Sequence, residues 1–535
     1  MASPITTFAA PPTATSDPIL QAMQAELTRE QAQLLLPGMQ RPYFIEYRLD
    51  DFDTYSAVAN YGALVREDNA HQRVIRVAVR IGDYQTDSST SRGDGTVAMA
   101  PTDTNPQAIR YALWTATDEA YKNALRAYSA KQAALKRFES APTEKDFATA
   151  TPVTHIDPLV TLSIDRAEWT HRIVQASGLY ASDPEVNAHA SDVQYSTSTI
   201  RGLAVNRYLV NTEGTIVRHG YTGYAATIAV GGQAPDGMEL GRENGTTAVA
   251  AKDLESPAAF RRRVIDNLKS LEALRHAPVV SSDDYHGPVL FSPDASADIL
   301  SALFIPNIEA RRPELGTTSR TQGEYASSLH ARVLPDFLSV TDDPLTSTFA
   351  GQSLLGAYTI DDEGTPAQKV DLVTDGKLQA YLTDRTPIRD FPTSNGHGRA
   401  AVAQAAHAQQ SVTLFKSSEP LSAEAINARL LALAKEQNRD VYFVETLGGP
   451  LAPRLLYLVH PDGTRKLVRG AVFDELDNRT LRSGILAAGS DARVANNLAA
   501  VPTTTIAPSL LFDDIEVKRA TEQQQKLPYY PPPTK

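Results

Sequence analysis

The chain has 535 residues, of which 42% are hydrophobic and 21% charged, and its formal net charge is -12. This is an ordinary globular composition in a chain too long for one core, so two domains are expected. The acidic balance argues against a nucleic-acid-binding surface, the absence of cysteine excludes disulfides, thiolate metal ligands and cysteine nucleophiles, and no apolar run is long enough to span a bilayer.

The beginning of the chain predicts a helix followed by strands. Asp17 is a candidate N-cap before Pro18, and the helix that they open is expected to end by Gly38. Apolar and polar residues then alternate over 43–49 and again over 73–84. This alternation indicates strands with one face buried in a core and one face against polar surroundings.

The rest of the first half continues the mixture of helices and strands. Residues 105–138 carry apolar residues at helical spacing, and 207–218 read as a hairpin with its turn near Glu213 and Gly214. Ser256 can cap a further helix. The polar run 279–286 then breaks the pattern, so we place a domain boundary there.

The second half is rich in predicted strands. Residues 369–382 form a hairpin with the tight-turn pair Asp375-Gly376, and a second hairpin spans 455–473. Residues 422–436 between them are predicted to be helical. The predicted ranges are a flexible leader 1–16, an N-terminal α/β domain 17–285, a C-terminal β-rich domain 286–526 and a Pro-rich tail 527–535.

Several stretches of the chain together carry a family resemblance. Residues 337–344 (FLSVTDDP), 356–366 (GAYTIDDEGTP) and 394–399 (SNGHGR) occur in this order, with 42–47 (PYFIEY) before them and 507–512 (APSLLF) after them. In this arrangement they resemble the TldD/PmbA family of metallopeptidase-related proteins. The resemblance implies an α+β fold in two domains, with N-terminal helices on a mixed sheet and a C-terminal, mainly antiparallel curved sheet.

Active members of that family carry His-Glu-x-x-x-His on a helix and a distant cysteine, which together bind zinc and activate a water molecule. The resemblance places this helix at 295–306, with Ser301 and Pro306 at the histidine positions and Ala302 at the glutamate position. None of these side chains can do that chemistry, and a proline would bend or end the helix. We therefore expect no cofactor in this chain and zinc only in active relatives.

The histidines support the same interpretation without any alignment. The eleven histidines are scattered, the closest pairs (His276 and His286, His397 and His407) are ten residues apart, and no His-Glu dipeptide occurs. Folding can still bring distant histidines together, so a zinc site with non-standard ligands stays open as an alternative.

Two segments are candidates for binding. In the loop 394–399, Asn395, His397 and Arg399 offer groups that could hold a peptide carbonyl or carboxylate, and a plain connecting loop is the alternative. The carboxylates of Asp361, Asp362 and Glu363 could form a cation site or an acid/base pair, but we favour a turn stabilised by backbone hydrogen bonds.

Three functions are compatible with the sequence. The first is a non-catalytic, peptide-binding subunit that pairs with itself or with an active family homologue. The second is an active peptidase with non-standard ligands, and the third is a self-assembling structural or binding protein on the same fold. The partners expected are a second copy or a homologue and unstructured peptides, with no nucleic acid and no membrane span. The chain as given begins with no signal peptide, yet the resemblance favours a periplasmic or secreted protein over a cytoplasmic one.

Overall fold

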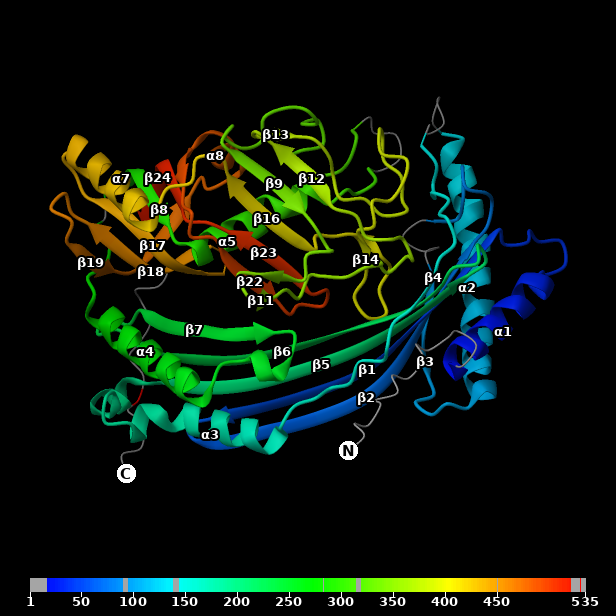
Figure 1. Ribbon diagram of the computed structural model, residues 1–535, viewed down its shortest axis with the longest axis horizontal. Helices are drawn as coiled ribbons and strands as arrows, with labels where there is room; N and C mark the ends of the chain where they lie inside the picture. Colours follow the sequence, from blue (N-terminus) through cyan, green and yellow to red (C-terminus); the bar gives the residue numbers. More distant parts are fainter. Residues whose placement is uncertain are drawn as a thin grey trace, which may run out of the picture.

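Four long strands dominate the N-terminal half of the computed structural model, which describes residues 17–89, 95–137, 144–281, 283–313, 319–449, 451–520 and 530 (Figure 1). They are β1 (Phe44–Asn60), β2 (Ala63–Arg80), β5 (Tyr195–Asn211) and β6 (Ile216–Gln233). Each pairs antiparallel with its neighbour in the order β2-β1-β5-β6, and together they form a curved sheet. The predicted leader 1–16 and the tail 527–535, apart from Tyr530, lie outside the described residues.

Three shorter strands complete this sheet. They are β3 (Thr96–Ala100), β4 (Thr154–Ile156) and β7 (Glu239–Ala248). β3 pairs with β2, β7 pairs with one end of β6, and β4 runs parallel to the other end of β6. The sheet is therefore mixed, because one pair is parallel and the others are antiparallel.

Two pairs of helices cover one face of the sheet. They are α1 (Pro18–Gln33) with α2 (Pro106–Leu135), and α3 (Arg166–Ser182) with α4 (Pro257–His276). Each helix begins after a side chain that accepts a backbone N–H bond, as the sequence predicted for Asp17, Asn105 and Ser256. Odd-numbered residues of β1 pack under both pairs, so the even-numbered residues face the C-terminal half.

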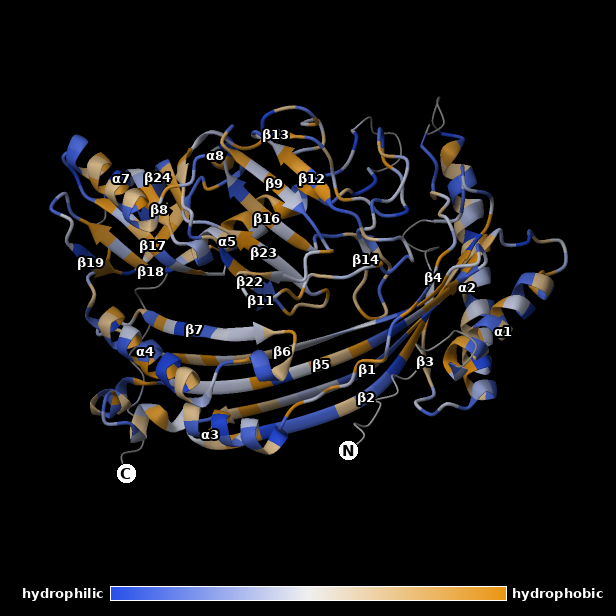
Figure 2. Ribbon diagram, in the orientation of Figure 1, coloured by the Kyte–Doolittle hydropathy of each residue, from blue (hydrophilic) through white to orange (hydrophobic). Residues whose placement is uncertain are grey.

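The long strands extend further than the alternation indicated. β2 begins at Ala63 rather than Arg73, and its first ten residues are exposed. They carry no one-sided apolar pattern, so period-two reasoning could not detect them. Figure 2 shows this change along β2, which is hydrophilic over much of its free half and hydrophobic beside α2.

The C-terminal half contains two larger sheets. The first has the order β13-β12-β9-β16-β23-β22, and the second has the order β19-β18-β17-β8-β24-β20, with β21 also on β24. Most pairs are antiparallel, while β16 with β23 and β17 with β8 are parallel. The strands are β8 (Tyr285–Phe291), β9 (Leu338–Asp342), β12 (Val370–Thr374), β13 (Lys377–Leu378), β16 (Val412–Ser417), β17 (Val441–Gly448), β18 (Ala452–Val459), β19 (Arg465–Val468), β20 (Ala471–Asp474), β21 (Ile485–Ala488), β22 (Arg493–Asn497), β23 (Thr503–Ala507) and β24 (Leu510–Arg519).

Short elements fill the spaces around these sheets. The helices are α5 (Pro293–Leu303), α6 (Ile305–Ile308), α7 (Ala423–Glu436) and α8 (Asn478–Ser483), and the 3-10 turns are η2 (Asn187–Asp192) and η3 (Ala251–Asp253). The two-stranded pairs are β10 (Thr348–Phe349) with β11 (Gln352–Ser353), and β14 (Gly398–Arg399) with β15 (His407–Ala408). The α+β fold class is confirmed, and both predicted C-terminal hairpins form. The predicted domain limits at 285 and 286 stay a prediction.

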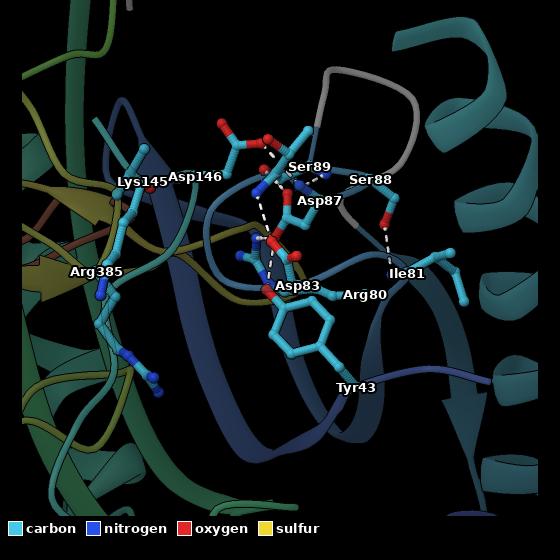
Figure 3. A network of polar contacts seen from close by, with 12 residues as sticks. Tyr43, Arg80, Ile81, Asp83, Asp87, Ser88, Ser89, Lys145, Asp146 and Arg385 are labelled. Atoms are coloured by element: carbon cyan, nitrogen blue, oxygen red, sulfur yellow. Dashed lines mark hydrogen bonds and ion pairs between the residues drawn. The ribbon is translucent and has the colours of Figure 1, made fainter. Parts of the chain in front are cut away.

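A buried network ties the two halves together near α2 (Figure 3). The Asp87 carboxylate accepts a bond from Arg80 Nη1 at 2.8 Å, and the Asp87 N–H donates to Asp146 Oδ2 at 2.8 Å. The ring of Phe147 lies between two guanidinium groups, with Arg80 at 3.8 Å and Arg385 of the C-terminal half at 4.0 Å from its centroid. Charged groups sandwiching an aromatic ring in a dry environment hold this junction in one geometry.

Within the described residues, no helix is long and apolar enough to cross a bilayer. The periplasmic or secreted location stays a prediction.

Candidate functional site

The best candidate site is a cavity of about 190 Å3 between β6 and the loops of the C-terminal half. We call it the β6 cavity. Its lining combines charged, aromatic and apolar side chains, which is typical of small-ligand pockets. The lining residues are Asp157, His219, Gly220, Tyr221, Leu355, Ala357, Tyr358, Thr359, Ile360, Asp361, Asp362, Arg399, Ala400, Val501 and Pro502.

Arg399 is the principal cation of the cavity. Its side chain is largely buried, its Nη1 donates to the Gln410 carbonyl at 2.8 Å, and its guanidinium lies 4.8 Å from the centroid of the Tyr358 ring. The described residues place no carboxylate within ion-pair distance of it. The aromatic contact and the carbonyl therefore orient Arg399 without neutralising its charge.

Asp362 is neutralised from the N-terminal sheet. Arg207 on β5 lies between two carboxylates, with Nε 2.5 Å from Asp50 Oδ1 and Nη1 2.6 Å from Asp362 Oδ1. His219 Nε2 is 3.2 Å from the same oxygen of Asp362. Burial alone would raise the pKa of Asp362, but Arg207 and His219 hold it well below its ordinary value. Asp362 is therefore an ionised link between the two halves.

Asp361 has the opposite environment. Its Oδ1 accepts bonds from the N–H groups of Glu363 (3.0 Å) and Thr365 (2.7 Å), and its Oδ2 accepts one from Gly398 (2.9 Å). Burial raises the pKa of Asp361 to about 8, although these N–H groups act in the other direction. Gly364 supplies the positive φ of +77° that closes the turn.

Glu363 has a hydrogen-bond partner that differs from those of Asp361 and Asp362. Its Oε2 accepts the Arg385 N–H at 2.7 Å, and burial raises its pKa well above the ordinary value. The three carboxylates of the candidate cation cluster thus have separate partners. Among the described residues, a spacing suited to a metal ion occurs at His189, Asp192 and Glu272, which are not part of this cluster.

Of the three candidate residues in the loop 394–399, only Arg399 lines the cavity. His397 is fully buried, with Nε2 3.1 Å from Asp342 Oδ1 and Nδ1 3.0 Å from Asn395 Oδ1. The amide of Asn395 also accepts the Thr383 N–H at 2.9 Å. Asn395 and His397 therefore position the backbone that carries Arg399, and a direct binding role for either stays a prediction.

His219 and Tyr221 are cavity residues that sequence reasoning missed. Both lie on β6 beyond the predicted 207–218 hairpin and project to the face that meets the C-terminal half. Their alternation along the strand was a usable signal, because it continues the period of the hairpin. Nothing local indicated which loop would lie opposite them.

The helix that the resemblance assigns to zinc binding is α5 with α6. α5 ends at Leu303 and α6 begins at Ile305, so the expected break before Pro306 occurs. Ser301 Oγ lies 3.0 Å from Thr505 Oγ1, while Ala302 and Pro306 are exposed.

Comparison with known proteins places the chain in a family. Residues 284–519 match the family model of the PmbA/TldA metallopeptidase C-terminal domain. The C-terminal half of the chain therefore contains a domain of the TldD/PmbA family. No curated protein matches it.

Solved structures have a similar fold over nearly the whole length of this chain. A Thermotoga maritima MSB8 protein described as a modulator of a DNA gyrase is 16% identical, with a TM-score of 0.61 and coverage of 93% of this chain and 99% of its own. TldE from Thermococcus kodakarensis is 12% identical, with a TM-score of 0.60 and coverage of 93% and 100%. A Bacteroides thetaiotaomicron VPI-5482 protein, also described as a modulator of DNA gyrase, is 12% identical, with a TM-score of 0.60 and coverage of 94% and 98%. At these identities the likeness establishes the fold.

The residues of α5 and α6 do not fit a zinc ion. Ser301 offers only a hydroxyl that is already paired with Thr505, and Ala302 and Pro306 have no ligating or basic group. A zinc ion at that helix would therefore lack both its ligands and a general base.

Proposed function

We propose that this chain is a peptide-binding TldD/PmbA protein that does not use zinc chemistry on α5. The observation that carries the proposal is the contrast between two places. The β6 cavity contains Arg399 as an oriented cation with no carboxylate partner among the described residues, while α5 and α6 present Ser301, Ala302 and Pro306 where the family motif would stand. A binding role fits the first and a non-catalytic role fits the second.

The ligand class follows from the charges in the cavity. Asp362 forms an ion pair with Arg207, and Asp361 has a pKa of about 8, so Asp361 is largely protonated at neutral pH. The charge of Arg399 therefore remains for a ligand, and a guanidinium binds a carboxylate with two parallel hydrogen bonds. We infer that the cavity receives a carboxylate of an unstructured peptide, either an acidic side chain or the C-terminus.

The size of the cavity agrees with this ligand. A volume of about 190 Å3 suits one side chain or one chain end, and is too small for a folded partner. Leu355, Val501 and Pro502 supply apolar contact beside the charged groups.

Arg399→Ala is the direct test. Fluorescence polarisation with a library of labelled unstructured peptides, with free or amidated C-termini, should show binding to the wild-type chain that falls at least tenfold in the variant. Arg439→Ala is the matched control, because Arg439 also lies over a tyrosine ring (Tyr285, 4.4 Å) and bonds a carbonyl, but lies outside the cavity. Equal affinity in wild type and Arg399→Ala would remove the cavity as the binding site.

The non-catalytic part of the proposal has its own measurement. Mass spectrometry of the same peptides after incubation with the chain, with and without added ZnCl2, should show no cleavage. Cleavage by the wild-type chain that persists at constant specific activity through purification would overturn it and favour the alternative of an active peptidase.

A second surface supports pairing with a second copy or with a family homologue. The segment 63–72 of β2 pairs with β1 on one side only, and all ten residues are exposed. A long exposed edge offers unpaired N–H and C=O groups to another strand. We propose that this free edge, 63–72, is where the chain associates with its partner.

A further inference from the structure

Two histidines and two carboxylates that are distant in the sequence meet at the outer end of α4. His189 and Asp192 lie on η2, and Glu272 and His276 lie one turn apart on α4. We call these four residues the α4 cluster. Figure 1 shows α4 at the end of the long sheet opposite to α1 and α2, and none of the four residues lines the β6 cavity.

The ligand atoms of His189, Asp192 and Glu272 lie close together, and His276 contacts the same Glu272 oxygen as His189. Glu272 Oε1 lies 3.3 Å from His189 Nδ1 and 2.6 Å from His276 Nε2, and His189 Nδ1 lies 3.9 Å from Asp192 Oδ2. One ligand atom from each of His189, Asp192 and Glu272 lies within 4.8 Å of the others. Ligand atoms on one tetrahedral zinc ion lie roughly 3.4 Å apart, so small side-chain movements would complete such a site.

The local structure favours this arrangement. Residues at i and i+4 share a helix face, so Glu272 and His276 point to the same side of α4, where η2 presents His189 and Asp192. A cavity of about 180 Å3, lined by His189, Asp192 and Glu272 among others, opens beside the cluster. An ion can therefore reach these groups without opening the fold.

Arg275 competes with a bound cation for the carboxylates of Asp192 and Glu272. Its Nη1 lies 2.5 Å from Asp192 Oδ2 and 3.2 Å from Glu272 Oε2. It therefore holds Asp192 Oδ2, the oxygen that faces His189, and an ion would have to displace it there, while Glu272 Oε1 faces the two imidazoles. The other charged groups beside the cluster are Glu185 and Lys269, which pair with each other at 2.7 Å.

We propose that the α4 cluster binds one Zn2+ ion through His189, Asp192, Glu272 and His276. Two imidazoles with two carboxylates form a ligand set suited to zinc. The ion would clamp η2 to α4, a structural role that is separate from α5 and from the β6 cavity.

Titration calorimetry with ZnCl2 on the full chain, without an affinity tag, tests the proposal. The wild-type chain should bind one ion, and the midpoint of thermal unfolding should rise with zinc. In the double variant His189→Gln/His276→Gln the affinity should fall at least tenfold and the thermal shift should disappear. His460→Gln is the matched control, because His460 also pairs with an aspartate (Asp440, 2.7 Å) on the surface but belongs to no group of three potential metal ligands among the described residues.

Two further measurements separate a zinc site from a network of ion pairs. Co2+ in place of zinc should give the visible absorption of a tetrahedral complex, which the double variant should lack. Arg275→Gln should bind zinc more tightly, because it removes the competing cation. Absence of saturable binding by the wild-type chain, or equal binding by the double variant, would overturn the proposal. Peptide binding at Arg399 is measured separately, so either proposal can fail alone.

Discussion

Asp361 and Asp362 are adjacent in the chain but have opposite electrostatic environments. Arg207 and a hydrogen bond with His219 hold the pKa of Asp362 low, whereas burial raises the pKa of Asp361 to about 8. Neighbouring carboxyl groups whose pKa values are pushed apart are a recognised mark of functional sites. Here the separation leaves Arg399 as the available charge of the β6 cavity.

The raised pKa of Asp361 predicts how stability changes with pH. The folded-state pKa of about 8 exceeds the ordinary value of 3.8, so the folded state holds a proton that the unfolded state loses. The corresponding stabilisation is complete below pH 3.8 and is lost as the pH rises towards 8. Asp384, whose pKa burial raises to about 6, acts in the same direction.

We therefore expect the free energy of unfolding to decrease from pH 5 to pH 8. In Asp361→Asn this decrease, which we call the pH slope, should be smaller by about 1–3 kcal/mol. Urea unfolding at both pH values measures it. Absolute stability of the variant should also fall, because an amide nitrogen cannot accept the third N–H bond, so the slope is the informative quantity. Asp375→Asn, at an exposed hairpin turn, should leave the slope unchanged. Equal slopes in Asp361→Asn and wild type would contradict this account.

The turn 361–365 of the C-terminal half packs closely against the N-terminal half at Gly364. A methyl group at Gly364 would lie 2.6 Å from Thr215 Cγ2, an atom of the turn between β5 and β6. Gly351 has a similar positive φ, +81° against +77°, but a methyl group there would meet nothing within 4 Å. Substituting alanine at each position therefore distinguishes the cost of backbone strain, which both share, from the cost of the steric contact, which only Gly364 has.

Gly364→Ala should destabilise the chain more than Gly351→Ala. The shared left-handed backbone costs about 1 kcal/mol at either position, and the steric overlap should add roughly 1–3 kcal/mol at Gly364. Chemical denaturation of both variants at one pH gives the difference. An equal loss of unfolding free energy in the two variants would mean that the turn 361–365 can move to accommodate the methyl group without disturbing the long sheet.

Local sequence patterns predicted the helix starts correctly but not the lengths of the strands. The caps at Asp17, Asn105 and Ser256 predicted helix starts, because a cap is a contact within three residues. Strand lengths were underestimated, because the exposed segment 63–72 of β2 has no buried face to impose alternation.

The association of the whole molecule with a partner is proposed to depend on the free edge 63–72. Val65, 61% exposed, stands in this edge. Val65→Lys should weaken self-association at least tenfold, since a lysine on an edge opposes strand pairing. Analytical ultracentrifugation over a concentration series measures the dissociation constant.

Leu159→Lys provides the control, because Leu159 is 54% exposed but lies outside any strand. If the wild-type chain alone is monomeric at all concentrations, self-association is excluded and the proposed partner at this edge is a family homologue. A dimer unaffected by Val65→Lys would place the interface elsewhere.

The sequence by itself determined the fold class, the helix starts, the two C-terminal hairpins and, through motifs in a fixed order, the family. These features rest on contacts between residues close in the chain, or on patterns that a single segment carries. It also determined that α5 has no histidine, since that is a matter of residue identity.

Only the tertiary structure decided which groups meet. Asp362 pairs with Arg207 and His219, Arg399 reaches the β6 cavity while His397 does not, and His189 contacts Glu272. Each of these contacts joins segments far apart in the sequence, and no local periodicity carries information about them. The physical reason is that burial and pairing of charges depend on how the two halves pack, which is settled by the whole chain at once.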